Sequence, residues 1–354
     1  MEPKNKFQTF LRDIWPVLLL SLILFIIVFF LEIIINDKII SRSLNEALIR
    51  LVVVIGLFIF IGNSGIISFG HIGFMMIGAY ATAWQTMDPM TKDIFVPGLP
   101  SYLLKNSHHW FIATIFGGIV SAIVAFISGI AIMRLSGIAA SIGTFAVMMA
   151  FYSLYMNWTT WTAGQSSLVG IPVTTTPWVG LLFSIIAMIG AFLYSSSRLG
   201  ASIRATREDE IAAKSAGINM TLQRIISFTI SAFFVGMAGG LYAHFLGILT
   251  VDTFHLPLTF ITLSMLVVGG MQSLSGAIIG TLVLSFVIEF LRAFEKGINV
   301  GVELSLPANS AEIGLGLILL LIIIFRPSGL TRNLDIYWPW KPKIASSSVT
   351  KRQS

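Results

Sequence analysis

The stretch IWPVLLLSLILFIIVFFLEIII, residues 14–35, decides the fold of this chain, because several further apolar runs of similar length follow it. A helix that crosses the hydrocarbon core of a bilayer needs about 20 mostly apolar residues. This run has 22 residues and a single charged side chain, Glu32. It is too long for the apolar part of a signal peptide and lacks a small-residue cleavage site, so we interpret it as a retained membrane helix.

The composition also indicates a membrane protein. Of the 354 residues, 56% are hydrophobic and 11% are charged, whereas a soluble domain carries about a quarter charged residues. The pattern predicts an all-α, polytopic membrane helix bundle of about ten transmembrane segments, some of them short or broken, with no separate soluble domain. The predicted segments are 14–35, 44–62, 72–86, 110–133, 137–157, 177–195, 223–246, 257–271, 276–292 and 310–326.

Three of these segments, 72–86, 257–271 and 276–292, are short for a full crossing, and we expect tilted, broken or re-entrant helices there. The predicted domain organisation has three parts. They are an N-terminal segment (1–13), a transmembrane domain (14–330) and a basic, polar C-terminal tail (331–354), which we expect to be disordered.

The distribution of Lys and Arg predicts the orientation. Ten crossings place both termini and the loop 197–222 on one side, and most of the Lys and Arg residues fall on that side. By the positive-inside rule, both termini and this loop are expected to be cytoplasmic. The two largest polar loops, 87–109 and 158–176, are expected on the opposite face.

Several classes of chemistry are excluded or disfavoured by missing residues. The chain has no cysteine, which excludes disulfides, thiol catalysis and Fe–S clusters. It has no P-loop motif, and its five histidines show no metal-ligand pattern, so we expect no bound cofactor or metal and no catalytic residue. The net charge of +6 does not indicate a nucleic-acid partner, because the basic residues lie in loops and at the C-terminus of a chain whose surroundings are lipid.

The most strongly charged internal segment is SRLGASIRATREDEIAAKSAGI, residues 197–218. It predicts a short helix: Thr206 begins a T-x-x-D capping box, Glu210 and Lys214 have the spacing of an i, i+4 ion pair, and Gly217 is placed to end the helix. On the residues alone, the segment is either a solvated connector or a helix that docks a cytoplasmic protein.

A second candidate is GNSGIISFGHIG, residues 62–73, a polar and glycine-dense run between two apolar segments. If the helix breaks here at membrane depth, the freed backbone groups need protein or a water-filled cavity around them. Asn63, Ser64, Ser68 and His71 would then face a translocation pathway, as in transporters built from broken helices. An ordinary cytoplasmic turn is the alternative.

Two further patterns leave their interpretation open. The G-x-x-x-G spacings at 236–240 and 276–280 permit close helix packing, either within the chain or at a subunit interface. The polar external stretch 159–168 could receive a partner, line a mouth, or be a solvated loop.

Four stretches and the ending of the apolar region together resemble the LivM-type permease subunits of bacterial ABC importers for branched-chain amino acids and related solutes. The resemblance spans about residues 50 to 330, in the same order as in the family, and the charged loop is its most specific part. The stretches are GNSGIISFGHIGFMMIGAY (62–80), the loop 197–218, GMAGGLYAHFLG (236–247), VGGMQSLSGAIIG (268–280) and FRPSGL (325–330).

The resemblance implies an alternating-access importer in the bacterial cytoplasmic (inner) membrane. The charged loop would be the coupling helix that fits a cleft on a separate ATPase subunit. Two such subunits would bind ATP and Mg, a LivH-type permease or a second copy would complete the membrane pair, and a periplasmic solute-binding protein would deliver the solute. The coupling positions are Arg204, Arg207, Glu208, Asp209, Glu210, Ile211, Lys214 and Gly217.

The solute and two other function classes stay open on the sequence. The family often has a T-G-G-[ST]-[DN]-G-like loop where this chain has TAGQSS (162–167), so urea, short amides or aromatic acids are alternatives to branched-chain amino acids. A channel or secondary carrier acting alone would need ion-coupling residues inside its helices, and few are present. A membrane enzyme would need a nucleophile–base pair or a metal constellation, so we expect a transport subunit and no enzyme.

Overall fold

The computed structural model describes residues 6–35, 37–295, 298–299, 303–304, 310–326 and 329–332. The longer helices are α1 (Lys6–Phe29), which continues as a π-helix η1 (Phe30–Ile35), α2 (Lys38–Ser64), α3 (His71–Thr86), α6 (Trp110–Ile132), α7 (Gly137–Asn157), α9 (Pro177–Ser196), α10 (Arg198–Glu208), α12 (Met220–Leu246), α13 (Leu256–Gly269), α14 (Leu274–Glu295) and α15 (Ser310–Phe325). The shorter elements are α4 (Pro89–Phe95), α5 (Ser101–Lys105), α8 (Thr159–Thr162), α11 (Glu210–Ser215), η2 (Val251–Phe254) and the strands β1 (Leu168–Val169), β2 (Ile248–Leu249), β3 (Ile298–Asn299) and β4 (Glu303–Leu304).

The all-α, polytopic prediction is confirmed. Within the part of the chain that the structure describes, eight helical segments are long and apolar enough to cross a membrane. The two remaining predicted segments correspond to α3 and α15, with 16 residues each. The expected shortness holds for α3 but is wrong for the other two, because α14 has 22 residues and α13 forms a candidate span of 19 residues together with η2, Val251–Gly269.

The predicted domain organisation stays a prediction, and the candidate membrane span begins at Ile14. Residues 6–13 of the predicted N-terminal segment belong to helix α1. The predicted tail is described only as far as residue 332, and residues 333–354 lie outside the described residues, so the expectation of disorder there stays a prediction.

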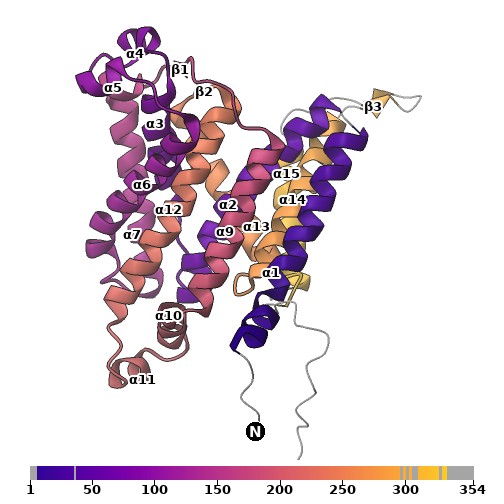
Figure 1. Ribbon diagram of the computed structural model, residues 1–354. Coiled ribbons are helices and arrows are strands. Elements are labelled where there is room, and N and C mark those ends of the chain that lie inside the picture. The colour runs from indigo at the N-terminus through magenta and orange to yellow at the C-terminus, as the bar shows by residue number, and fades with distance from the viewer. Residues whose placement is uncertain are drawn as a thin grey trace, which may run out of the picture.

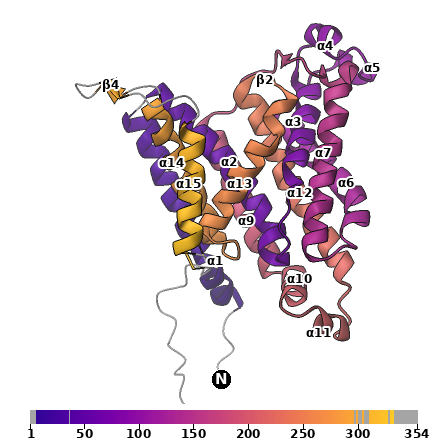
Figure 2. The same ribbon diagram turned by 180° about the vertical axis from the view of Figure 1, so that it is seen from behind.

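Helices α2 and α12 form the centre of the bundle (Figure 1). The most apolar 18-residue window of α2 is 94% buried, whereas α1 and α7 are buried to only 17% and present apolar side chains outward, as a lipid-facing helix does. Helix α12 packs against α2, α3 and α6, and α2 also packs against α9 and α14. Seen from behind, α13, α14 and α15 lie together on the side of the bundle opposite α6 and α7 (Figure 2).

Small residues bring the central helices close together. Gly236 and Gly240 of α12 face α3 and α6, and a Cβ atom at Gly78 of α3 would collide with the carbonyl of Gly236. Ser121 of α6 donates a hydrogen bond of 2.9 Å to the carbonyl of Phe74 across the same contact. Gly276 likewise packs on α13. Both G-x-x-x-G spacings therefore serve packing within the chain, as small residues commonly do in membrane bundles.

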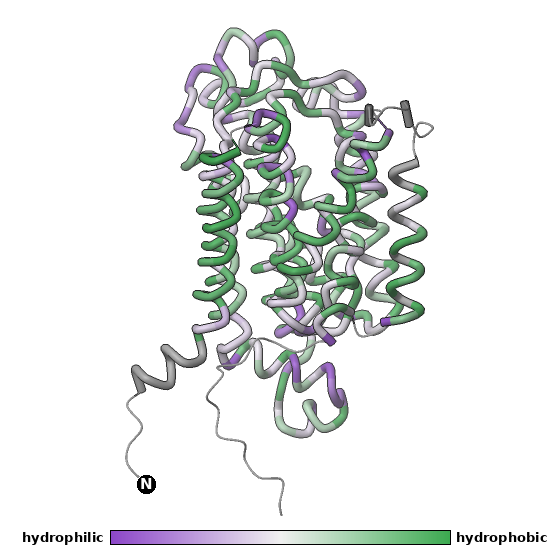
Figure 3. The backbone as a smooth tube through the Cα atoms, turned by 90° about the vertical axis from the view of Figure 1, so that its right-hand side faces the viewer, coloured by the Kyte–Doolittle hydropathy of each residue, from purple (hydrophilic) through white to green (hydrophobic). Residues whose placement is uncertain are grey.

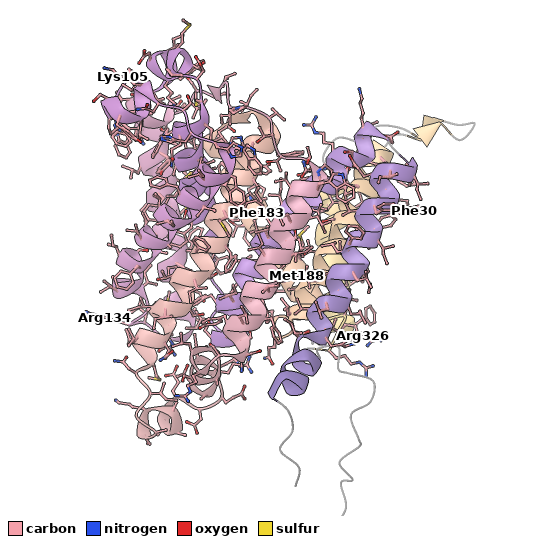
Figure 4. All side chains as sticks on the ribbon, in the orientation of Figure 1. Phe30, Lys105, Arg134, Phe183, Met188 and Arg326 are labelled. Carbon is pink, nitrogen blue, oxygen red and sulfur yellow. The ribbon has the colours of Figure 1, made fainter. Side chains whose placement is uncertain are left out.

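The two ends of the bundle differ. Polar residues gather at both ends and apolar ones between them (Figure 3). One end carries α10 and α11, together with Arg134 and Arg326, and we name it the α10 end (Figure 4). The opposite end, the α4 end, carries α4, α5, Lys105 and the antiparallel pair β1–β2. The turn 329–332 lies beside α13 at the α10 end, where Leu330 N donates to the carbonyl of Val268 over 2.7 Å.

Candidate functional site

Helix α10 is anchored along one face to the α10 end of the bundle. Its first turn is fixed by Ser197, whose hydroxyl oxygen accepts the N–H of Gly200 at 3.2 Å and donates to the carbonyl of Tyr194 at 2.6 Å. Ile203 and Thr206 are buried, and α10 packs against α2, α9 and α12. The segment is therefore more than a solvated connector.

Two arginines of α10 bind the last turn of α2. Arg204 Nη1 donates to Oδ1 of Asn63 at 2.8 Å, and Arg207 Nη1 donates to the carbonyl of Gly62 at 2.7 Å. The last carbonyls of a helix have no intrahelical donor, and they carry the negative end of the helix dipole. An arginine at this position can donate to an unpaired carbonyl, and its positive charge faces the negative end of the dipole. The charged loop and the glycine-dense run therefore form one site.

Helix α2 ends at the position that the sequence indicated. Gly65 follows it with a φ of +73°, a left-handed conformation that glycine adopts without strain. A Cβ atom at Gly65 would also lie 2.7 Å from Cγ of Arg207. Residues 65–70 are not helical, and Phe69 N donates to Thr144 Oγ1 of α7 at 3.2 Å. We name this segment the α2–α3 break.

A polar chain crosses the bundle directly after the break. His71 Nδ1 lies 2.7 Å from Ser68 Oγ, and His71 Nε2 lies 2.8 Å from Ser231 Oγ of α12. Ser231 in turn donates to the carbonyl of Gly56 at 2.6 Å. The ring of His71 is also enclosed by aromatic rings, the closest being Phe228 at 5.1 Å between centroids. These hydrogen bonds connect α2, α3 and α12.

The four predicted pathway residues all lie in or beside the break, but their side chains are buried in the protein. They are Asn63, Ser64, Ser68 and His71. Ser64 Oγ accepts the N–H of Ile66 at 3.2 Å, and Asn63 Nδ2 donates to the carbonyl of Ile59 at 3.0 Å. In the break it is Ile67 that is exposed, to 39%. The exposure of Asn63, Ser64, Ser68 and His71 to a pathway stays a prediction.

The second half of the charged loop is the separate helix α11, and the predicted capping box is wrong. Thr206 lies inside α10, where its hydroxyl donates to the carbonyl of Ile203 at 2.7 Å. Asp209 is extended and is itself the N-cap of α11, accepting the N–H groups of Ile211 and Ala212 at 2.8 and 3.0 Å. One aspartate thus ends one helix and begins the next.

The end of α11 is as predicted. Gly217 has a φ of +80°, and its N–H donates to the carbonyl of Lys214 at 3.0 Å. The N–H of Ile218 donates to the carbonyl of Ala213 at 3.1 Å. These two bonds make a Schellman motif, in which glycine is the favoured residue.

Helix α11 is held to α12 by an ion pair that the sequence analysis missed. Glu210 pairs with Arg224 of α12 and not with Lys214, so the predicted i, i+4 pair is wrong. Arg224, which is 5% exposed, also donates to the carbonyl of Leu135 between α6 and α7 at 3.3 Å. The signal that could have found this pair is an arginine in the first turns of an otherwise apolar segment.

The remaining side chains of the loop point away from the bundle. Ile211 is 81% exposed, the side chain of Glu208 is 71% exposed, and Lys214 is exposed as well. Ile211 therefore places an apolar side chain between two side chains of opposite charge on the outer surface of the loop. We name Glu208, Ile211 and Lys214 the α11 face.

The loops at the α4 end are folded onto the bundle. In the stretch 159–168, Thr162 is buried and donates to the carbonyl of Tyr155 at 2.6 Å, and Trp84 Nε1 donates to the carbonyl of Trp161 at 2.8 Å. Lys92 is fully buried, and its Nζ donates to the carbonyls of Leu103 and Asn106 at 2.8 and 2.6 Å. Burial lowers the pKa of Lys92, an effect that nearby Asp88 opposes.

Comparison with known proteins gives a family match over most of the chain. Residues 39–325 match the family described as branched-chain amino acid transport system / permease component. The chain is 27% identical to the high-affinity branched-chain amino acid transport system permease protein LivM of Salmonella typhimurium over 322 residues, which cover 80% of this chain and 68% of the relative. It is 27% identical to LivM of Escherichia coli K12 over 323 residues, with the same coverage of both chains.

A second kind of relative is the permease protein LivH. The chain is 27% identical to LivH of Salmonella typhimurium over 244 residues, which cover 66% of this chain and 78% of the relative. No solved structure gives a significant match to this chain.

Proposed function

Because the chain belongs to the family of branched-chain amino acid transport system permease components, we propose that it is the transmembrane permease subunit of a binding-protein-dependent ABC importer. The solutes would be branched-chain amino acids, which the names of the LivM and LivH relatives specify. Two separate ATPase subunits would bind ATP and Mg, a LivH-type chain would be the second permease, and a periplasmic protein would deliver the solute. The α10 end would face the cytoplasm of a bacterium, with both termini, and the chain itself would catalyse no reaction.

One observation carries this proposal: Arg204 and Arg207 of α10, the helix that leads into the α11 face, bind the last turn of α2 directly before the α2–α3 break. A partner that moves the α11 face moves α10, and α10 is bonded to the last turn of α2 immediately before the helix breaks. Hydrogen bonds from charged donors are stronger and more directional than neutral ones. The loop is thereby suited to transmit a displacement from an ATPase to the membrane helices, while its own residues perform no chemistry.

We further propose that the α2–α3 break borders the solute path. Ile67 and Phe69 of the break form an apolar groove of about 180 Å³ with Phe260 and Met271. Phe69 and Phe260 meet edge to face at 6.2 Å between ring centroids. In this arrangement Ser68 and His71 hold the break in shape, and a second permease subunit would close the groove from the other side.

The test is reconstitution of the complete system. The chain is expressed with a candidate LivH-type permease, candidate ATPase subunits and a candidate periplasmic binding protein, and the complex is placed in liposomes. Uptake of radiolabelled leucine that requires ATP and the loaded binding protein supports the proposal. Uptake by this chain alone, or uptake that persists without ATP, contradicts the proposal and favours a channel or a secondary carrier. An ATPase that never copurifies with the chain contradicts it as well.

A further inference from the structure

A polar pocket opens at the α4 end, on the side of the bundle away from the α11 face. It has a volume of about 450 Å³, within the usual range for sites of small molecules. Four separate segments line it: the π-helix η1, the start of α2, residues 173–177 before and at the start of α9, and the end of α12. None of these residues belongs to the site described above.

One part of the pocket offers hydrogen-bond acceptors without donors. Asn45 is only 3% exposed, its Nδ2 donates to the carbonyl of Thr175 at 2.6 Å, and its Oδ1 has no hydrogen-bond partner. Glu32 accepts from Ser41 through Oε1 at 3.2 Å, while its Oε2 is buried and has no partner. Buried acceptors are rarely left unpaired, because water must be stripped from them without compensation. Both residues line the pocket, and a side-chain rotation that turned these two oxygens toward it would let them accept from a ligand with several donors, as an ammonium group has.

Glu32 also lies in an unusual backbone element. It belongs to η1, a π-helical turn at the end of α1. Such turns are rare and are frequently found at functional sites.

Another part of the pocket favours an anion. Arg42 lines it, with Cζ lying 5.8 Å from the centroid of the Phe245 ring, which holds the guanidinium against the wall. Helix α9 begins in the pocket with Pro177, and its N-cap Thr176 makes no side-chain capping bond. A helix N-terminus carries unpaired N–H groups and a partial positive charge, and both attract a carboxylate.

The charges and the apolar wall together select the ligand. The lining residues Glu32, Asp37, Lys38 and Arg42 sum to zero net charge, which matches a zwitterion. Phe245 and Leu246 supply an apolar surface beside them. Asp37 is already used to cap α2, since its Oδ1 accepts the N–H of Ile39 at 2.7 Å. Glu32 is therefore the carboxylate that is available to a ligand.

We propose that this pocket binds the zwitterionic main chain of a branched-chain amino acid on the side from which solute arrives. The ammonium group lies between Glu32 and Asn45, and the carboxylate lies at the start of α9 beside Arg42. The aliphatic side chain packs on Phe245. This inference rests on the proposed function for the identity of the solute, and it assigns the chain a recognition site of its own besides that of the external binding protein.

The test measures binding of radiolabelled leucine to the assembled permease–ATPase complex in nanodiscs, without ATP and without the external binding protein. Arg42→Gln and Glu32→Gln are compared with Lys105→Gln and Asp93→Asn, which remove matched charges at the α4 end outside the pocket. Leucinamide, which lacks the carboxylate, and N-acetyl-leucine, which lacks the ammonium, serve as competitors. Both Arg42→Gln and Glu32→Gln are expected to weaken leucine binding by about tenfold, or about 1.4 kcal/mol. The two control variants are expected to bind like the native protein.

The two competitors test the carboxylate-binding part and the ammonium-binding part of the pocket separately. They can be used on the native protein, so the test remains possible even if a variant fails to fold. Native complex that prefers leucine over both analogues supports the proposal. Arg42→Gln is expected to lose the preference over leucinamide only, and Glu32→Gln the preference over N-acetyl-leucine only. A native complex that binds the three compounds equally, or variants that change neither preference, would overturn the assignment.

A lipid headgroup with an amine and a phosphate has similar chemistry, so the nanodiscs are prepared with phosphatidylcholine alone and with added phosphatidylethanolamine. Leucine binding that is unchanged supports the proposal. Leucine binding that is abolished by phosphatidylethanolamine assigns the pocket to the lipid and overturns it. If the complete system transports leucine but the permease–ATPase complex binds no leucine by itself, the pocket proposal is contradicted and the proposed function is not. Selective leucine binding to a complex that transports no amino acid supports the pocket and removes the proposed function alone.

Discussion

Arg204 and Asn63 lie 141 residues apart in the sequence, and Nη1 of Arg204 donates a 2.8 Å hydrogen bond to Oδ1 of Asn63. The bond joins α10 to the last turn of α2. Asn63 is held in place from its other end, since its Nδ2 donates to the carbonyl of Ile59 at 3.0 Å. The pair therefore connects a surface helix to the helix that is most deeply buried in the bundle, two residues before the break begins.

The first prediction concerns this bond. Asn63→Leu and Arg204→Gln are each expected to lower leucine uptake per ATP hydrolysed by about tenfold or more, since loss of a charged hydrogen bond is worth about 1.5–3 kcal/mol. The double variant is expected to be no worse than the single variants, because they remove the same bond. Uptake and ATP hydrolysis are measured together in liposomes. Additive losses in the double variant would mean that the two residues act separately.

The second prediction concerns the α11 face. Ile211→Asp places a charge on a side chain that is 81% exposed, so the chain should fold and insert normally, but the ATPase should be retained about tenfold less during purification. Ile94→Asp is the matched control, since Ile94 is 71% exposed on α4 at the opposite end. Retention of the ATPase is measured by quantitative copurification. Equal retention in both variants would place the docking surface elsewhere.

The third prediction separates backbone strain from a steric clash. Gly65 and Gly217 both have a positive φ, of +73° and +80°, but a Cβ atom would lie 2.7 Å from Arg207 Cγ only at Gly65, while nothing lies within 4 Å at Gly217. Gly217→Ala is expected to cost about 1 kcal/mol from the left-handed conformation alone. Gly65→Ala is expected to cost more and to reduce uptake, because it also displaces Arg207. Thermal unfolding in detergent and leucine uptake are the measurements, and equal effects of both variants on uptake would contradict the role of Arg207.

The bundle could be predicted from the sequence to a large extent because its signals are local. Apolar runs of membrane length mark the helices, and the end of α11 follows from Gly217 because glycine favours a positive φ. The capping box failed because a T-x-x-D spacing fits either one helix with Thr206 as its cap or a helix broken at Asp209. Burial of Thr206 under the bundle decides between them, and that burial is a tertiary effect.

The remaining residues could not be predicted, because their partners lie on other helices or loops. The pair of Glu210 with Arg224 depends on how the chain turns between α11 and α12. The pocket at the α4 end depends on four segments that meet only in the folded chain, so neither Asn45 nor Arg42 carries a local signal. The same holds for Lys92, whose burial follows from the packing of α4 against α5.

The fourth prediction distinguishes a structural from a pathway role for the polar residues of the break. Ser231→Ala removes the hydroxyl that lies 2.8 Å from His71 Nε2, and it is expected to lower the free energy of unfolding by about 1–3 kcal/mol without changing KM for leucine. Ser128→Ala is the control, because Ser128 bonds only within α6. If Ser68 faces the solute path, Ser68→Ala will change KM as well. A change in stability alone would assign Ser68 to the scaffold of the break.

The fifth prediction concerns pH and the buried Lys92. Burial lowers the pKa of Lys92 below its usual value of 10.5, so the unfolded chain binds more protons than the folded chain in the window between the two pKa values. Stability contributed by Lys92 therefore rises with pH across that window. The unfolding free energy of the native protein minus that of Lys92→Met is expected to increase as the pH is raised toward about 10.5, where the unfolded side chain titrates. Lys105→Met, at an exposed position on α5, is the matched control. A difference that falls with pH for Lys92→Met would mean that the ammonium form is the one that the fold prefers.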